Sequence, residues 1–199
     1  MPLDVIHRQT LRNRLIALPQ DPVFLPNGTP FRQNLDSQKT STLEECQSVL
    51  ETVGLLGFIE SRGGLDSGMT PSTLSQGQKQ LFSLARAVLR RRVRFRERAD
   101  GKGLNTSSAH PSEGGILLLD EFSSSVDIET DRAMQEIITR EFENYTVIMV
   151  SHRLEMVVNS FDRVIIMDHG RIVESGDPRS LQRESGSRFA ELARASEML

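Results

Sequence analysis

The sequence predicts an α/β fold built around a mainly parallel sheet. Two short apolar runs, Ile116–Leu119 and Thr146–Val150, each end directly in polar residues. Continuous apolar runs of this length suit strands that are buried on both faces, as in a parallel sheet. The third observation is a helical run over residues 79–89, whose apolar side chains form one stripe that can pack against a core.

The other elements follow from the same reasoning along the chain. Residues 1–20 supply a short lead-in and one strand, and residues 30–92 form a mainly helical subdomain with helices near Thr42–Val53 and Ser75–Arg91. The later elements are a strand at 163–167, a turn, an edge strand at 171–175, and closing helices at 178–182 and 187–198. We assign residues 115–185 to the sheet core and 186–199 to a C-terminal helix.

Composition fits a single globular domain. The 199 residues can bury a sizeable core, and the net charge of −3 gives no general reason to expect nucleic acid as a partner. The single cysteine, Cys46, excludes an internal disulfide and fits a reducing compartment. No apolar run approaches the ~18 residues of a membrane span, so membrane association would come through a partner.

The helix that starts near residue 75 carries a candidate anion site. Ser75 and Gln78 are spaced as a capping box, which satisfies free amides at a helix start. Gly77 removes a side chain where a ligand would approach closely. Free N–H groups and the positive end of the helix dipole favour phosphate at this position. An ordinary capped helix is the alternative interpretation.

Two adjacent carboxylates, Asp120 and Glu121, follow the apolar run Ile116–Leu119. In a parallel sheet they would lie at the carboxyl edge, where open α/β sheets bind their ligands. The alternative is a solvated strand end, which commonly carries acids. Further along, Asp127 suits the N-cap of a helix with one apolar face, and His152 follows the second apolar run.

These motifs, in this order, resemble those of ABC-type ATPases. Leu74–Gln78 is similar to the signature motif of that family. Asp120 and Glu121 end a strand that resembles Walker B. The resemblance implies that Asp120 meets Mg²⁺ through water and that Glu121 is the base for the attacking water. Ser75, Gly77 and Gln78 would contact ATP held by a partner domain.

Three further stretches extend the resemblance. Phe122–Asp127 matches the D-loop, which makes Asp127 both a helix cap and a contact at a domain pair. His152 matches the switch histidine, which contacts the γ-phosphate. Gln20, in the run Gln20–Leu25, resembles the Q-loop glutamine that reaches Mg²⁺ and the attacking water. The run looks most like the second nucleotide-binding domain of multidrug-resistance-type exporters of the C subfamily.

The resemblance implies a RecA-like P-loop NTPase core with a helical subdomain. It implies ATP and Mg²⁺ as cofactors, and a second nucleotide-binding domain and exporter transmembrane domains as partners, at the cytoplasmic face of a membrane. Catalysis in such enzymes consists of positioning and charge stabilisation around the phosphoryl group.

One family motif is missing from the sequence. No G-x-x-x-x-G-K-[ST] loop, the Walker A element that cradles the β- and γ-phosphates, occurs in the 199 residues. Lys79 lies within the signature helix, and Gly101-Lys102-Gly103 lacks the required spacing. The sequence therefore predicts the C-terminal two-thirds of a nucleotide-binding domain, without the Walker A strand and loop, and weak or no ATP hydrolysis by the chain alone.

Residues 93–114 interrupt the family pattern. A run of arginines leads into glycine, asparagine, serine and proline, which predicts a disordered surface insertion. The arginines suit a solvated helix end, where cations favour the dipole; a nucleic-acid patch is disfavoured because no aromatic platform accompanies them. The arginines are Arg90, Arg91, Arg92, Arg94, Arg96 and Arg98.

Two other functions compete with a transporter ATPase. A soluble ABC-type ATPase without a transport role is disfavoured by the exporter-like run at 20–25. A non-catalytic interaction module could use the signature face to bind another nucleotide-binding domain. Measured ATP hydrolysis separates the second alternative from an enzyme.

Overall fold

The computed structural model describes residues 3–100, 114–122, 126–151 and 154–197. The chain divides into two compact units, Met1–Val150 and Ser151–Leu199. Asp120, Glu121 and the start of α5 lie in the first unit. No helix in the described part of the chain is long and apolar enough to cross a membrane.

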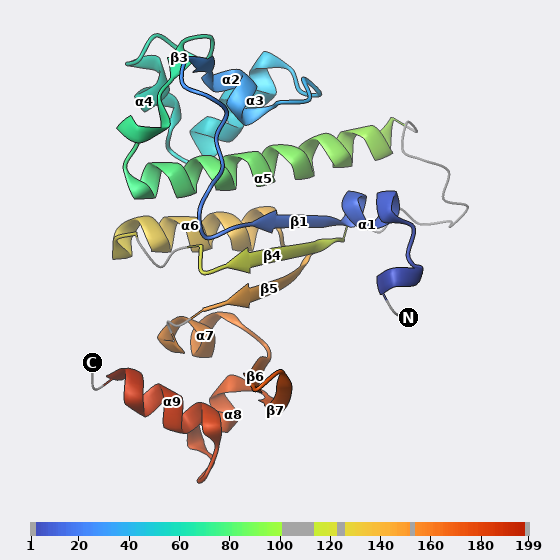
Figure 1. The fold of residues 1–199 in the computed structure, drawn as a ribbon, viewed down its shortest axis with the longest axis vertical. Helices are drawn as coiled ribbons and strands as arrows, with labels where there is room; N and C mark the ends of the chain where they lie inside the picture. The colour runs from blue at the N-terminus through green and yellow to red at the C-terminus, as the bar shows by residue number, and fades with distance from the viewer. Residues whose placement is uncertain (1–2, 101–113, 123–125, 152–153, 198–199) are drawn as a thin grey trace. The chain divides into compact units, whose positions relative to one another are not determined.

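A three-stranded parallel sheet forms the centre of the first unit. Its order is β1 (Leu15–Leu18), β4 (Ile116–Asp120) and β5 (Thr146–Val150), with β4 in the middle. The register places Leu18 beside Leu119 and Asp120 beside Val150. The carboxyl ends of all three strands therefore meet at one edge, which confirms the predicted α/β class with a parallel sheet (Figure 1).

Two long helices accompany this sheet. Helix α5 (Gln76–Ala99) contacts β1 and helix α6 (Ile128–Glu141). Their inner faces are apolar. The fully buried side chains include Phe82, Leu84 and Val88 of α5, Met134 of α6 and Leu117 of β4. Burying such side chains stabilises the fold by about 1.5–3 kcal/mol each.

A layer of short elements packs on the side of α5 away from the sheet (Figure 1). It falls in the stretch, residues 30–92, where the sequence predicted mainly helices. Thr42 caps α3 in a capping box with Glu45. The elements are β2 (Thr29–Pro30), α2 (Phe31–Leu35), α3 (Leu43–Thr52), α4 (Leu56–Glu60), β3 (Gly68–Met69) and the 3₁₀ turn η2 (Pro71–Thr73). At the N-terminal end, the 3₁₀ turn η1 (Leu3–Val5) and helix α1 (Arg8–Arg14) precede β1.

Helix α5 is longer than the sequence indicated. It continues to Ala99, so residues 93–99, placed in the disordered insertion by their composition, are helical. The reason lies in partners that are distant in sequence. Arg92 pairs with Glu141 at the end of α6, Arg96 pairs with Glu45 on α3, and both thereby hold the helix in place. Residues 101–113, the remainder of that expectation, lie outside the described residues.

The second unit contains α7 (Leu154–Ser160), β6 (Val164–Asp168), β7 (Arg171–Gly176), α8 (Pro178–Arg183) and α9 (Arg188–Glu197). Strands β6 and β7 form an antiparallel pair with an irregularity between Ile166 and Met167. Glu174 of β7 accepts hydrogen bonds from Ser187 Oγ and from the Phe189 amide, which fixes the start of α9. Among the described strands, β6 pairs with β7 alone and β5 with β4 alone.

Candidate functional site

The turn at residues 75–78 has the geometry that its sequence predicts. The Ser75 amide donates to Gln78 Oε1 at 3.0 Å, and the Gln78 amide donates to Ser75 Oγ at 3.1 Å. This capping box opens α5 directly after the exposed Ser75. The amides that the box leaves free point out of the first turn, where the helix dipole favours an anion.

Gly77 lies beside the start of α6. A Cβ atom at this position would meet Thr130 Cγ2 at 3.5 Å and Ser75 Oγ at 3.9 Å, which are ordinary van der Waals contacts. The chain itself therefore has room for an alanine at residue 77. A requirement for glycine here would have to come from a ligand or a partner that approaches the turn closely.

The predicted carboxylates lie at the carboxyl edge of the central strand. Asp120 is the last residue of β4 and is exposed. The Glu121 amide donates to the Val150 carbonyl at 3.1 Å, and Glu121 adopts a φ of 44°. A left-handed backbone is uncommon at a non-glycine residue and carries a conformational cost. The turn aims the chain out of the sheet immediately after Asp120.

Gln20 follows β1, the strand next to β4. Strand β1 ends at Leu18, beside Leu119, so the chain that carries Gln20 leaves the sheet at the same edge as Asp120 and Glu121. Carboxylate and amide oxygens are ligands suited to Mg²⁺, which keeps several waters and takes phosphate oxygens as well. Asp120 and Gln20 supply oxygen atoms of the kinds that Mg²⁺ accepts.

Asp127 caps helix α6. Its carboxylate accepts from the Thr130 amide at 2.9 Å and from Thr130 Oγ1 at 2.8 Å. These two hydrogen bonds lower the pKa of Asp127 below its ordinary value. The same Thr130 side chain faces Gly77, so the starts of α5 and α6 lie next to each other. His152 and residues 123–125 of the predicted D-loop lie outside the described residues.

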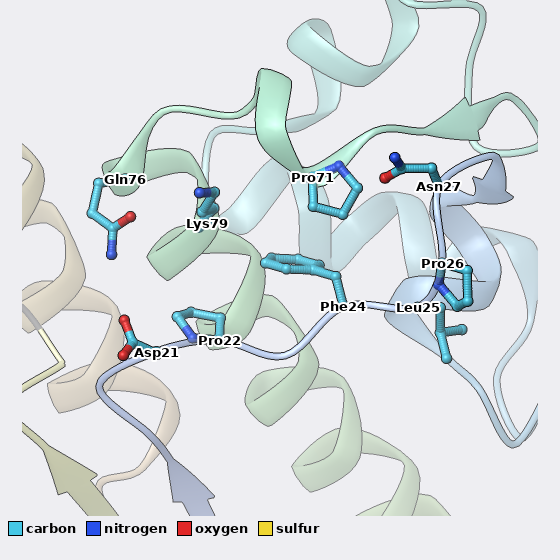
Figure 2. Close-up of a pocket in the computed structure, with 9 residues that line it drawn as sticks. All are labelled: Asp21, Pro22, Phe24, Leu25, Pro26, Asn27, Pro71, Gln76 and Lys79. Atoms are coloured by element: carbon cyan, nitrogen blue, oxygen red, sulfur yellow. The ribbon is translucent and has the colours of Figure 1, made fainter.

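A surface pocket of about 390 Å³ lies next to this group. Figure 2 shows Phe24 between Pro71 and the extended segment that follows β1, with Lys79 and Gln76 contributed by α5. The complete lining is Asp21, Pro22, Phe24, Leu25, Pro26, Asn27, Pro71, Gln76 and Lys79.

Sequence reasoning missed two side chains that join these parts. Gln80 donates from Nε2 to the Gln20 carbonyl at 2.6 Å, and Arg86 donates to the Val23 carbonyl at 2.5 Å. A signal was available at Arg86, because a cation within the apolar stripe of α5 needs a buried partner. Its partners lie 52 to 63 residues away and could not be identified from spacing.

Comparison with known proteins agrees with the motifs. A family model described as "ABC transporter" matches residues 2–93. The chain is 56% identical to the ABC-type transporter braE of Annulohypoxylon truncatum over 191 residues, and 51% identical to the ABC transporter FGM5 of Gibberella zeae over 192 residues. This chain belongs to the ABC transporter family.

Each of those alignments covers 96% of this chain and 12% of the relative. The ABC multidrug transporter B of Aspergillus fumigatus is 36% identical over 191 residues, which are 96% of this chain and 11% of that relative. The chain therefore spans about an eighth of the length of these ABC transporters, and it corresponds to nucleotide-binding domain sequence of fungal ABC transporters.

Proposed function

We propose that this ABC transporter segment binds and hydrolyses Mg²⁺-ATP as part of a nucleotide-binding domain that drives a transmembrane exporter. The observation that carries the proposal is the register of β1 and β4, which brings Gln20, Asp120 and Glu121 to one edge of the sheet. The C-subfamily character rests on the run at residues 20–25.

The roles of the individual residues follow from their placement. Asp120 and Gln20 would hold Mg²⁺ through water, and the cation would neutralise phosphate charge when bound. Glu121 would take a proton from the attacking water. Its strained backbone fixes the direction in which the carboxylate leaves the strand. By family resemblance, His152 would contact the γ-phosphate.

The signature turn would act on a second nucleotide. Ser75, Gly77 and Gln78 would face ATP held by another nucleotide-binding domain, and Asp127 would contact that domain while it caps α6. The pocket beside Phe24 would receive a segment of the transmembrane domains. Through those domains the segment would work at the cytoplasmic face of a membrane.

Gly77→Ala provides a sharp test in the full transporter. The added methyl group fits against Thr130, so the fold and thermal stability should persist. ATP hydrolysis should fall by about tenfold or more, because the methyl group occupies the approach of the partner's nucleotide. Gly68→Ala is the contrasting variant, because its Cβ would meet the Gly28 carbonyl oxygen at 2.9 Å and perturb the fold itself. Undiminished hydrolysis in Gly77→Ala would exclude the proposed role of the signature turn.

Glu121→Gln tests the catalytic base. It preserves the side-chain shape, so ATP binding should remain while hydrolysis stops. The 199-residue chain alone, which contains no Walker A motif, should show little turnover. Magnesium-dependent hydrolysis by the transporter that survives Glu121→Gln would assign the base elsewhere. A transporter that binds no ATP would favour the interaction module instead.

A further inference from the structure

We propose that Gln80 and Arg86 are positioning residues that clamp the backbone of residues 20–25 to helix α5, and thereby set the place of the Gln20 side chain. The inference rests on the proposed function, in which Gln20 acts on Mg²⁺ and on the attacking water. It adds a physical link between Gln20 and the signature turn (Ser75–Gln78), because α5 begins at that turn.

Arg86 provides the larger part of the clamp. Its guanidinium donates from Nε to the Asn34 carbonyl at 2.7 Å and from NH1 to the Val23 carbonyl at 2.5 Å. The guanidinium carbon lies 4.8 Å from the ring centre of Phe24 and 5.2 Å from that of Phe82. The planar fork of arginine can bond two carbonyls and stack on rings at once, which a lysine cannot do.

The environment of Arg86 supports a role in positioning. Burial lowers the pKa of its guanidinium to about 10, so the group still carries its charge at neutral pH. The hydrogen-bond partners described for it are carbonyl and amide oxygens rather than carboxylates. Partial burial of a charge opposite neutral groups is unfavourable unless fixed hydrogen bonds compensate it.

Asn34 extends the clamp to the far end of the segment. Its side chain, 3% exposed, accepts from the Leu25 amide at 2.9 Å through Oδ1. Its Nδ2 donates to the carbonyls of Thr29 and Pro30, each at 3.3 Å. Arg86 holds the Asn34 carbonyl, so α5 controls the Leu25 amide through one intermediate residue.

Gln80 holds the near end. Its side chain is 2% exposed, and Nε2 donates to the Gln20 carbonyl at 2.6 Å. Because the Gln20 carbonyl can only accept, the Gln80 side-chain amide must point its Nε2 toward it. Gln80 Oε1 has no hydrogen-bond partner within the described residues. Replacement of Gln80 by glutamate would place a negative oxygen against the carbonyl at nearly unchanged shape.

The first experiment measures peptide-level hydrogen exchange on the 199-residue chain. Arg86→Lys and Gln80→Glu should each speed exchange of the Leu25 amide, which donates to Asn34 Oδ1, by about tenfold or more, since each loosens the segment that carries this amide. Exchange across α6 should stay within about twofold. Arg90→Ala is the matched control, because Arg90 lies on the same helix and donates to the Arg12 carbonyl instead. Equal acceleration at α6 and at the Leu25 amide, or none at that amide, would overturn the clamp.

The second experiment measures ATP hydrolysis by the full transporter. The two clamp variants should lower kcat by about tenfold and leave KM for ATP within about twofold, because they displace Gln20 without altering the phosphate grip. Arg90→Ala should change neither constant. A raised KM at unchanged kcat would contradict the positioning role. A wild-type transporter without ATPase activity would refute the proposed function, whereas the exchange experiment decides the clamp independently.

Discussion

Glu141→Ala should destabilise the first unit, because Glu141 anchors Arg91 and Arg92, from which α5 continues to Ala99. Glu141, the last residue of α6, is 8% exposed. Its carboxylate accepts from Arg91 NH1 at 3.1 Å and from Arg92 NH2 at 2.6 Å. Arg92 also donates to Ser48 and Thr52 on α3, so one carboxylate braces the helical subdomain against α6.

The magnitude follows from how far the three side chains are removed from water. Removing one partner of a fully buried pair costs about 3–5 kcal/mol, whereas an exposed pair contributes about 0–1 kcal/mol. The carboxylate side chain is 10% exposed and the two arginines are 29% and 28% exposed. We therefore expect an intermediate loss of about 1.5–2.5 kcal/mol, which lowers the Tm by roughly 3–10 °C.

Urea unfolding followed by circular dichroism measures this loss, with an unchanged m value as the condition for the comparison. Alanine is a strong helix former, so helix propensity does not add to the loss. Glu136→Ala, at an exposed position of the same helix, is the control and should shift stability by less than about 0.5 kcal/mol. If Glu141→Ala shifted the free energy of unfolding no more than Glu136→Ala does, the ion pairs of Glu141 with Arg91 and Arg92 would not stabilise the fold. The length of α5 would then need another cause.

Three further outcomes follow from the described contacts. Burial alone would raise the pKa of Asp36, but the hydrogen bonds from Ser41 and Thr40 lower it by more, so the folded pKa lies below the ordinary value. Its contribution is therefore complete above about pH 4 and is lost as the pH falls through the folded pKa, so the stability gap to Asp36→Asn should close in acid titrations. Asp127→Ala should lower the midpoint of urea unfolding through loss of the α6 cap, and Asp127→Asn should restore most of the loss. Cys46 is fully buried and burial raises the pKa of its thiol, so alkylation by iodoacetamide should track unfolding and be at least about tenfold slower than in urea.

Local patterns were sufficient for much of this fold. The apolar runs mark β4 and β5 as strands, although the predicted burial on both faces does not hold for β5, where Ile148 and Val150 are 50% and 54% exposed. The capping residues Ser75 and Asp127 mark where α5 and α6 begin. These signals involve neighbours within about four residues, so composition and spacing contain them fully. The parallel class and the common edge of Gln20 and Asp120 follow from them.

The last part of α5, residues 92–99, could not be predicted in the same way. Its arginine-rich composition resembles that of a solvated or disordered segment, and the helix persists because Glu45 and Glu141 lie 51 and 50 residues away in sequence. The contacts of Gln80 and Arg86 have the same character. Such pairings depend on tertiary placement, which periodicity in a single sequence does not record.

Helix α5 joins three sets of contacts and contains no glycine or proline after Gly77. No glycine or proline occurs from Gln78 to Ala99, so the helix has none of the usual causes of a kink. At 1.5 Å per residue, a helix of 24 residues is about 36 Å long and moves largely as a rod. A displacement of the signature turn must then be taken up at the Gln20 segment, at α3 and at the end of α6 together. The ion pairs of Arg92 with Glu141 and of Arg96 with Glu45 therefore limit how far the signature turn can move by itself. Contact of that turn with a partner's nucleotide would shift Gln20 through Gln80 and Arg86.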